Sequence, residues 1–188
     1  NVGLGRDFTL FALCDGVVID PETVSEYHER MLGESIFLQR LVNDLLDLSR
    51  LQNADFHIEL QPVWLGDALA DAVRSARQLA LAKQIEIRFV QTGEGRMIRG
   101  DYGRLRQMFL TVLDNAVKYS PDGSPVDVSL DCGVVIVRDR GPGIAKQDLP
   151  QIFDRFFRGD VCSDHSGTGL GLAIAKQIAD RHEIVISV

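Results

Sequence analysis

The sequence predicts an α+β fold, in which a helical region precedes a sandwich of one sheet covered on one face by helices. A helical period extends from Asp20 to about Gln52 without strand-like alternation. After it, short segments of alternating apolar and polar residues are interleaved with further helical segments. Such mixing is typical of an α+β sandwich with antiparallel neighbouring strands. We therefore divide the chain into a helical region at 1–53 and a second domain at 54–188.

The helices are predicted from start signals and apolar periodicity. A short helix is expected within residues 1–20. The long helix starts after Asp20, a favoured N-cap, with Pro21 at its first position. Its second half has a coiled-coil seam, which needs a partner helix; packing of this helix on its own domain is the alternative. The seam consists of Leu38, Leu41, Leu45 and Leu48, widened by Val42 and Leu46. Further helices are predicted at 65–83, at 104–120 and from Gly167 onward.

The strands are predicted where apolar and polar residues alternate, or where β-branched residues cluster, between turn signals. Pro62 is expected to end the first strand because proline cannot donate to a ladder. Two of the strands are separated by a short turn and are expected to pair with each other. The predicted strands are 56–60, 85–90, 126–130, 134–137 and 184–188.

Composition excludes several classes of function. With 20 basic and 27 acidic residues the net charge is −7, which argues against broad binding to nucleic acid or to an anionic membrane. Cys14, Cys132 and Cys162 form no C-x-x-C pair, so we expect neither a zinc site nor a disulfide framework, and a reducing cytoplasmic setting. We find no apolar run of about 18 residues and no targeting leader, so no segment is expected to span a membrane.

Glycine-rich segments predict a nucleotide pocket. Asp139 follows the β-branched run 134–138, where a carboxylate at the strand end can face a ligand, and Pro142 stiffens the following turn. Gly141 and Gly143 lack the Cβ that would keep a flat base away from the backbone. A second set of glycines leads into a helix whose first N–H groups attract phosphate. This set comprises Gly167, Gly169 and Gly171.

Five motifs in order resemble those of the sensor histidine kinases, whose catalytic domain is similar to the ATPase domains of type II topoisomerases, Hsp90 chaperones and MutL proteins. The resemblance covers residues from about Met31 to Ala179. LDNAVKYS at 113–120 resembles the N box, DRGPG at 139–143 the first glycine box, IFDRFFR at 152–158 the F box, and GTGLG at 167–171 the second glycine box. LLDLSR at 45–50 resembles the end of the dimerisation hairpin.

The resemblance implies an ATP-dependent protein-histidine kinase of a two-component system, with ATP and Mg²⁺ as cofactors. Asp139 would accept from the adenine amino group, with a turn-capping role as the alternative, and Asn115 would hold Mg²⁺. Lys118 would neutralise phosphate charge and Tyr119 would lie near the base or ribose. Arg158 would reach the terminal phosphate, a rim salt bridge being the alternative. The remaining implied ATP-binding residues are Gly141, Gly143, Ile144, Phe153, Gly167, Thr168, Gly169, Leu170 and Gly171.

The family's phospho-accepting histidine is the largest departure, because we do not find it in this sequence. His28 precedes Glu29, but position 33 is Gly33, and the 17 residues from His28 to Leu45 are too few for a helix, a turn and a returning helix. Segments 6–9 and 13–16 resemble what flanks that motif, which suggests that residues between them are missing. In addition, Glu183 directly follows His182, where the family has a glycine pair.

Three classes of function follow. The first is the catalytic core of a sensor histidine kinase, which transfers the γ-phosphoryl of Mg·ATP to a histidine and then to a response-regulator aspartate. The implied partners are a receiver domain and a second copy bound through the hairpin, with membrane attachment only through segments absent from this chain. An ATP-binding switch, or a degenerate kinase without autophosphorylation, is the alternative. A water-using ATPase would need a catalytic carboxylate one turn before Asn115, where Thr111 stands.

Overall fold

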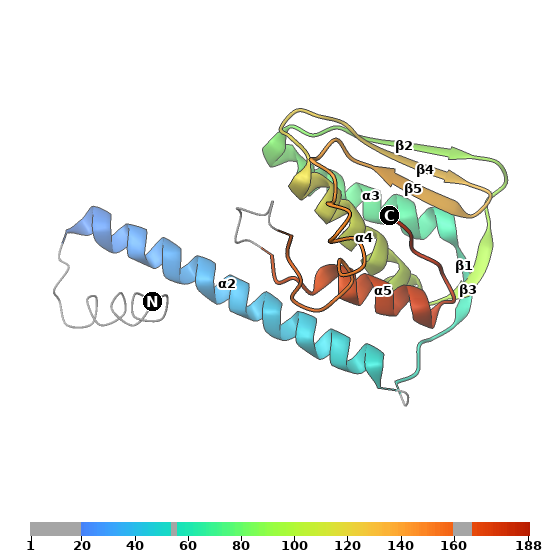
Figure 1. The fold of residues 1–188 in the computed structure, drawn as a ribbon, viewed down its shortest axis with the longest axis horizontal. Helices are drawn as coiled ribbons and strands as arrows, with labels where there is room; N and C mark the ends of the chain where they lie inside the picture. The colour runs from blue at the N-terminus through green and yellow to red at the C-terminus, as the bar shows by residue number, and fades with distance from the viewer. Residues whose placement is uncertain (1–19, 54–55, 160–166) are drawn as a thin grey trace. The chain divides into compact units, whose positions relative to one another are not determined.

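The computed structural model describes residues 20–53, 56–159 and 167–188, which include every predicted site residue. Residues 1–19, where the short helix is expected, therefore lie outside the described residues. The chain separates into two compact units, residues 1–43 and 44–188. Helix α2 (Pro21–Gln52) contributes to both units. Figure 1 shows the succession of elements along the chain.

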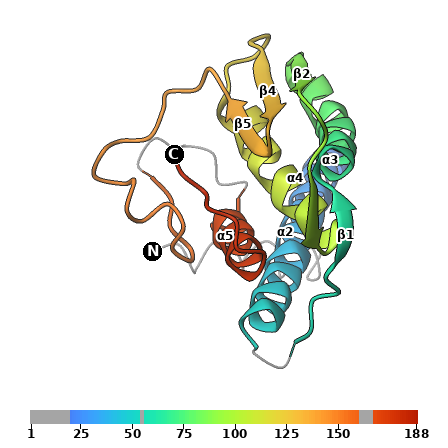
Figure 2. The ribbon, with the colours of Figure 1, turned by 90° about the vertical axis from the view of Figure 1, so that its right-hand side faces the viewer.

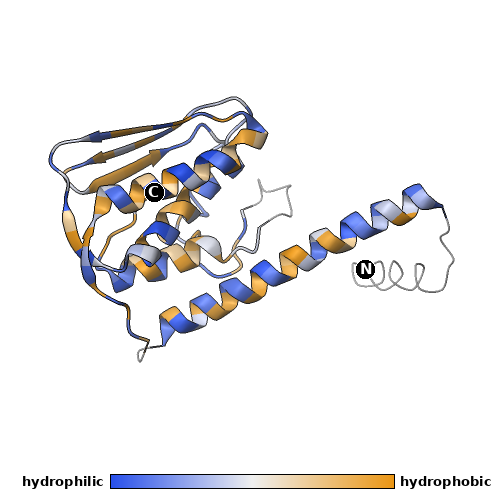
Figure 3. Cartoon of the chain, turned by 180° about the vertical axis from the view of Figure 1, so that it is seen from behind, coloured by the Kyte–Doolittle hydropathy of each residue, from blue (hydrophilic) through white to orange (hydrophobic). Residues whose placement is uncertain are grey.

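Helix α2 begins where the sequence predicted. The Asp20 carboxylate accepts hydrogen bonds from the Thr23 N–H at 3.0 Å and from the Thr23 hydroxyl at 2.7 Å, which caps the first turn. The Thr23 hydroxyl, and then its N–H, hold the pKa of the Asp20 carboxyl below its ordinary value. Apolar residues recur along the whole helix (Figure 3). Among them Leu38, Val42 and Leu46 are 58%, 53% and 51% exposed.

The second unit contains two sheets rather than the single sheet that we predicted. β1 (Gln61–Trp64) and β3 (Met97–Gly100) form an antiparallel pair. β2 (Ile87–Thr92), β4 (Val126–Asp131) and β5 (Val134–Arg138) form the other sheet, in the order β2-β4-β5. The expectation of antiparallel neighbours is confirmed for β4–β5 and wrong for β2–β4, which are parallel.

Helices α3 (Leu65–Ala80) and α4 (Tyr102–Tyr119) pack against one face of the three-stranded sheet, and α4 also packs against α5 (Gly171–Arg181). Figures 1 and 2 show the sheet with its helices on one side only. Alternation along β4 explains this, because its inward residues Val126, Val128 and Leu130 are buried. The buried face of α3 is rich in alanine, so α3 and α4 approach closely. Its fully covered residues are Ala68, Leu69, Ala72, Ala76 and Ala80.

Two predicted strands are absent, and one observed strand was not predicted. Residues 56–60 form no strand; the strand begins at Gln61 and includes Pro62, which a two-stranded ladder tolerates because the strand has a free edge. β3 was not predicted at all. Residues 184–188 form no ladder, and the Ile184 N–H donates instead to the Ala179 carbonyl at 2.8 Å.

Other elements differ from the predictions by a few residues. The predicted helix 65–83 ends as a 3₁₀ turn, η1 (Leu81–Lys83), after which Gln84 adopts the left-handed conformation with φ of 54°. β2 starts two residues later than predicted, since the Ile85 N–H bonds to the Ala80 carbonyl. α4 starts at Tyr102, capped by the Asp101 carboxylate, which accepts from the Arg104 N–H at 3.0 Å. α5 starts at Gly171 rather than Gly167.

Candidate nucleotide-binding site

The last two turns of α4 carry the predicted metal and phosphate residues. Asn115 is half-buried, and Asn115 and Tyr119 line the same cavity. Lys118 is not among the described lining residues. Its ammonium lies 5.4 Å from the centre of the Tyr119 ring and would be 2.8 Å from a Cβ placed on Gly167. The Lys118 ammonium therefore lies between Tyr119 and residues 167–171, the second glycine segment.

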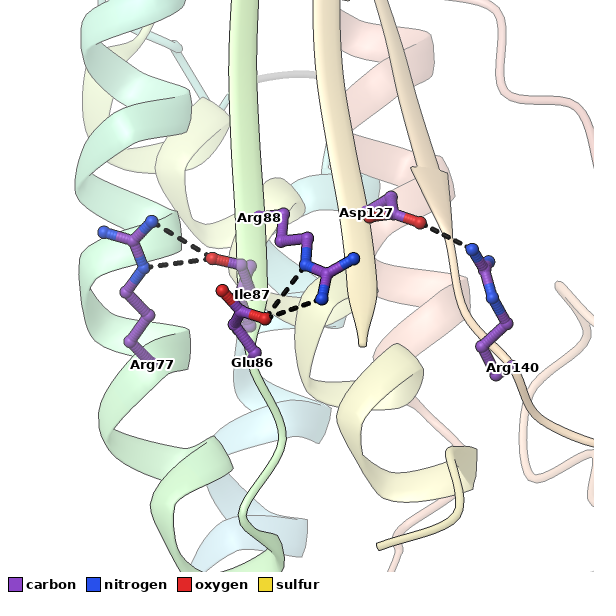
Figure 4. A network of polar contacts seen from close by, with 6 residues as sticks. All are labelled: Arg77, Glu86, Ile87, Arg88, Asp127 and Arg140. Atoms are coloured by element: carbon purple, nitrogen blue, oxygen red, sulfur yellow. Dashed lines mark hydrogen bonds and ion pairs between the residues drawn. The ribbon is translucent and has the colours of Figure 1, made fainter. Parts of the chain in front are cut away.

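The loop after β5 holds Asp139 at the mouth of this cavity. One Asp139 carboxylate oxygen accepts the Gly141 N–H at 2.7 Å, which is the turn-capping contact considered as the alternative role. Arg140 anchors the same loop, because its Nη2 donates to the Asp127 carboxylate on β4 at 2.7 Å (Figure 4). Gly143 has φ of 76°, a conformation that favours glycine.

Gly141 lies directly against the end of α4. A Cβ at this position would be 2.7 Å from the Tyr119 carbonyl oxygen, which is closer than real Cβ atoms come to backbone oxygen. The absence of a side chain thus lets the loop and the helix end touch. The end of α4 and the loop after β5, which the β4–β5 hairpin separates in the sequence, therefore meet and both line the cavity.

The segment 152–158 connects the cavity to the second glycine segment. Phe153 and Arg158 line the cavity, and Arg158 also donates to the Gly167 carbonyl. The Phe156 N–H donates to the Gly169 carbonyl at 2.8 Å. Gly169 has φ of 71°, and a Cβ there would lie 2.9 Å from the Phe156 backbone, so this position requires glycine.

The second glycine segment is itself outside the described cavity lining. The Thr168 hydroxyl donates to the Asp44 carboxylate at 2.8 Å, and the Leu170 N–H donates to the Thr168 hydroxyl at 3.3 Å. Leu170 is fully buried and precedes α5, whose N-cap position lacks a side-chain cap. The first N–H groups of α5 are therefore not satisfied by a capping side chain.

The cavity measures about 980 Å³, and it brings together most of the predicted site. The predicted residues that line it are Asn115, Tyr119, Asp139, Gly141, Gly143, Ile144, Phe153 and Arg158. Those outside its described lining are Lys118, Gly167, Thr168, Gly169, Leu170 and Gly171. The cavity also extends past β3 and residues 184–188, which the sequence did not place at the site.

Sequence reasoning missed several lining residues. Phe109 and Val112 are apolar residues of α4; Val112 lies three residues before Asn115, and that spacing could have indicated its place beside Asn115. Asp148 and Ala145 also line the cavity, but no motif distinguished them. Arg99, from the unpredicted β3, adds a basic group to the far side.

The chemistry of these groups fits a magnesium nucleotide. The volume is at the upper end of the range of about 300–1,000 Å³ found for small-molecule sites. The amide oxygen of Asn115 is a hard ligand suited to Mg²⁺, which keeps water and phosphate ligands. Among the described residues, no group of three or more histidine, cysteine, aspartate or glutamate side chains could hold a metal ion.

Comparison with known proteins shows the family to which the chain belongs. Residues 100–188 match the family model described as the histidine kinase-, DNA gyrase B- and HSP90-like ATPase. The sensor protein SphS of Synechococcus elongatus is 37% identical over 94% of this chain, and SenX3 of Mycobacterium tuberculosis is 36% identical over 90%. The chain spans only 45% and 42% of the lengths of these two relatives.

Solved structures give the same result. The mycobacterial sensor histidine kinase MprB has a TM-score of 0.60 and 34% identity, covering 65% of this chain and 82% of MprB. The cytoplasmic segment of the histidine kinase QseC has a TM-score of 0.53 and 32% identity, covering 76% and 77%. The second unit is thus a domain of the ATPase class shared by kinases, gyrases and chaperones. Within that class, the chain belongs to the sensor histidine kinases.

In the described part of the chain, no helix combines the length and apolar character needed to cross a bilayer.

Proposed function

We propose that this chain is the catalytic core of a sensor histidine kinase that binds Mg·ATP in the cavity beside α4. One observation carries the proposal: the end of α4, with Asn115 and Tyr119, and the loop of Asp139 meet at Gly141 and line one cavity. A related structure supports it. The structure of the histidine kinase ShkA is a complex with AMPPNP. ShkA is 30% identical to this chain, with a TM-score of 0.65, and the match covers 92% of this chain and 36% of the ShkA chain.

The chain's own groups would bind and orient the nucleotide. The Asp139 carboxylate has a second oxygen besides the one bonded to Gly141, and we assign this oxygen to the adenine amino group. Asn115 would hold Mg²⁺, while Lys118 and Arg158 would face the phosphates. Mg·ATP, when bound, supplies the γ-phosphoryl group. Positioning and charge neutralisation account for most catalysis of such transfers, so the domain needs no nucleophile of its own.

We further propose that the phosphoryl group passes to a histidine and then to an aspartate of a response-regulator receiver domain. The structure of the kinase ThkA in complex with the response regulator TrrA has the same fold, with a TM-score of 0.70 at 19% identity. In this chain His28 is exposed on α2, the same continuous helix that carries Leu45. The accepting histidine would therefore be one that the present residues do not include.

Part of the apolar seam of α2 is exposed and supports dimerisation: Leu38, Val42, Leu45 and Leu46 are 41–58% exposed, whereas Leu48 is buried. We propose that residues 1–53 form the dimerisation region, 54–188 the catalytic domain, and that the domain works in the cytoplasm as part of a membrane-bound sensor. An ATP-binding switch without phosphotransfer is the competing function. The hydrolase class is not favoured, because Thr111 stands where the catalytic carboxylate would be needed. The Thr111 hydroxyl donates to the Gln107 carbonyl of its own helix at 3.0 Å.

Two measurements test the proposal. Isothermal titration of this chain with Mg·ATP and Mg·GTP should show binding of ATP and a strong preference over GTP, because guanine presents an acceptor to the Asp139 carboxylate. The longer protein, incubated with γ-labelled ATP, should acquire an acid-labile, base-stable label that passes to a receiver domain. Binding without any label would favour the switch, whereas steady release of phosphate to water would favour a hydrolase.

A further inference from the structure

Lys83 makes an unusual set of contacts with the end of α4. This residue ends η1, and it does not belong to the described cavity lining. Its ammonium donates to the carbonyl oxygens of Val117 at 3.3 Å, Lys118 at 2.6 Å and Ser120 at 3.1 Å. An ammonium has three donors, and here each has an acceptor.

These contacts meet a specific need of the helix. The last carbonyl groups of an α-helix have no partner within the helix, and they form the negative end of its dipole. A cation that bonds several of them satisfies both their hydrogen bonding and their charge. Lys83 therefore stabilises the turn of α4 that carries Lys118 and Tyr119.

Backbone hydrogen bonds hold Lys83 in place on both sides. The Gly123 N–H, in the loop after α4, donates to the Lys83 carbonyl at 2.9 Å. On the other side, the Gln84 N–H bonds back to the Leu81 carbonyl at 3.1 Å, and Gln84 is left-handed. Lys83 thus connects the end of α3 to the last turn of α4 and to the loop that follows it.

The same turn of α4 touches the glycine loop on another side. The carbonyls of Val117, Lys118 and Ser120 bond to Lys83, while the carbonyl of Tyr119 lies against Gly141. A displacement of this turn would therefore change the spacing between Tyr119 and the loop of Asp139. Tyr119 and Asp139 both line the proposed nucleotide site.

We propose that Lys83 is a positioning residue of the nucleotide site, acting through the end of α4 without touching the ligand. The inference rests on the proposed function, because it concerns the affinity of the same cavity for Mg·ATP. It assigns a role to a lysine that none of the motifs contains.

The test compares Lys83→Met with Arg77→Met. Methionine keeps an apolar stem and removes the donors. Arg77 is a matched control, since its guanidinium donates to a single backbone carbonyl, that of Ile87, at 3.1 and 3.3 Å, on the side of α3 that faces β2 (Figure 4). Titration with Mg·ATP is performed at a temperature where thermal unfolding shows every variant to be folded. Hydrogen exchange of residues 116–120 is measured on the same samples.

If loosening in Lys83→Met leaves the last turn of α4 in the binding geometry about 10–20% of the time, Mg·ATP binding should weaken by about 5- to 10-fold, because the apparent affinity falls with the competent fraction. Exchange at 116–120 should quicken, and Lys83→Arg should restore much of the affinity. Arg77→Met should lower the melting temperature while leaving the affinity unchanged. If Lys83→Met does not fold, Lys83→Gln, which keeps two uncharged donors, replaces it in the same comparison.

The outcomes separate the inference from the proposed function. Equal affinity of the wild type and Lys83→Met, or equal loss in Lys83→Met and Arg77→Met, would overturn the positioning role alone. Absence of nucleotide binding by the wild type would overturn the proposed function and the positioning role with it.

Discussion

The Asp139 carboxylate accepts the backbone N–H of Gly141 at 2.7 Å, so one of its two oxygens holds the turn while the other is available to a ligand at the cavity. The capping role and the adenine-binding role, which were alternatives at the level of sequence, are therefore compatible in one residue. Two substitutions distinguish the two roles.

Asp139→Asn should weaken ATP binding by several-fold or more while leaving stability nearly unchanged. The single asparagine oxygen can still accept the Gly141 N–H, but the NH2 group then faces the adenine amino group, so the charge-assisted bond to adenine, worth about 1.5–3 kcal/mol, is lost. Asp139→Ala should in addition lose about 1 kcal/mol of stability with the cap. Thermal unfolding with and without Mg·ATP measures both effects, since a bound ligand raises the midpoint. A full ATP-induced shift in Asp139→Asn would contradict the adenine role.

Gly141→Ala should disturb both the fold and the site. The added Cβ would be 2.7 Å from the Tyr119 carbonyl oxygen, so the loop or the helix end must move. We expect a loss of about 1–3 kcal/mol, as for other overpacking substitutions, with weaker binding of Mg·ATP. Gly103→Ala is the control, because its Cβ would make an ordinary contact of 3.4 Å with the Asp101 carboxylate. Equal stability of the two variants in urea would show that the loop has room for a side chain.

Ser120→Ala should stabilise the domain by up to about 1 kcal/mol, since burying an unpaired hydroxyl is unfavourable. Ser120 is 2% exposed, and its hydroxyl has no hydrogen-bond partner within the described structure. Ser124→Ala is the matched control, because the Ser124 hydroxyl donates to the Pro121 carbonyl at 2.6 Å and its loss should be mildly destabilising. A lower midpoint for Ser120→Ala than for Ser124→Ala would mean that the Ser120 hydroxyl is bonded in solution.

Tyr102→Phe should destabilise the protein in a pH-dependent way. The Tyr102 hydroxyl donates to the Asp71 carboxylate, and this hydrogen bond lowers the pKa of Asp71 below its ordinary 3.8. Because the pKa is lower in the folded state, the stabilisation is complete above pH 3.8 and is lost as the pH falls through the lower folded value. The difference in melting temperature between wild type and variant should therefore be constant near neutral pH and shrink in acid.

A double-mutant cycle with Asp71→Ala checks the Tyr102 prediction. The hydrogen bond from Tyr102 also raises the pKa of that phenol above its ordinary 10.0, so the stabilisation should decline again at strongly alkaline pH. At neutral pH the two substitutions should be non-additive, because each removes the same bond. Additive effects at every pH would show that the side chains act independently.

The start of α2 was predictable from sequence because its signals are local. Asp20 and Pro21 mark the start of α2, and the Thr23 contacts to Asp20 are those of an N-cap. The helix predicted at 104–120 from apolar periodicity corresponds to α4. The hairpin of β4 and β5 followed from two β-branched runs separated by a short turn. In each case the residues that decide the structure lie within a few positions of one another.

The paired strands β1 and β3 could not be predicted in the same way. β1 exists because Gln61–Trp64 pairs with Met97–Gly100. The register joins Gln61 to Gly100 and Trp64 to Met97, which are 39 and 33 positions apart in the sequence. Residues 56–60 alternate more clearly but have no such partner. Likewise 184–188 has the alternation of a strand and no ladder. Alternation indicates which residues can form a strand, whereas pairing decides which do.

The sequence by itself determined the helices, the motif order and eight of the residues that line the cavity. Tertiary structure alone decided that Asp139 shares its carboxylate with Gly141, that Gly141 touches Tyr119, and that Lys83 bonds the end of α4. These relations join residues from different elements, and they depend on how α3, α4 and β5 pack. Local propensity and spacing contain no information on such distances, because packing of the buried core sets them.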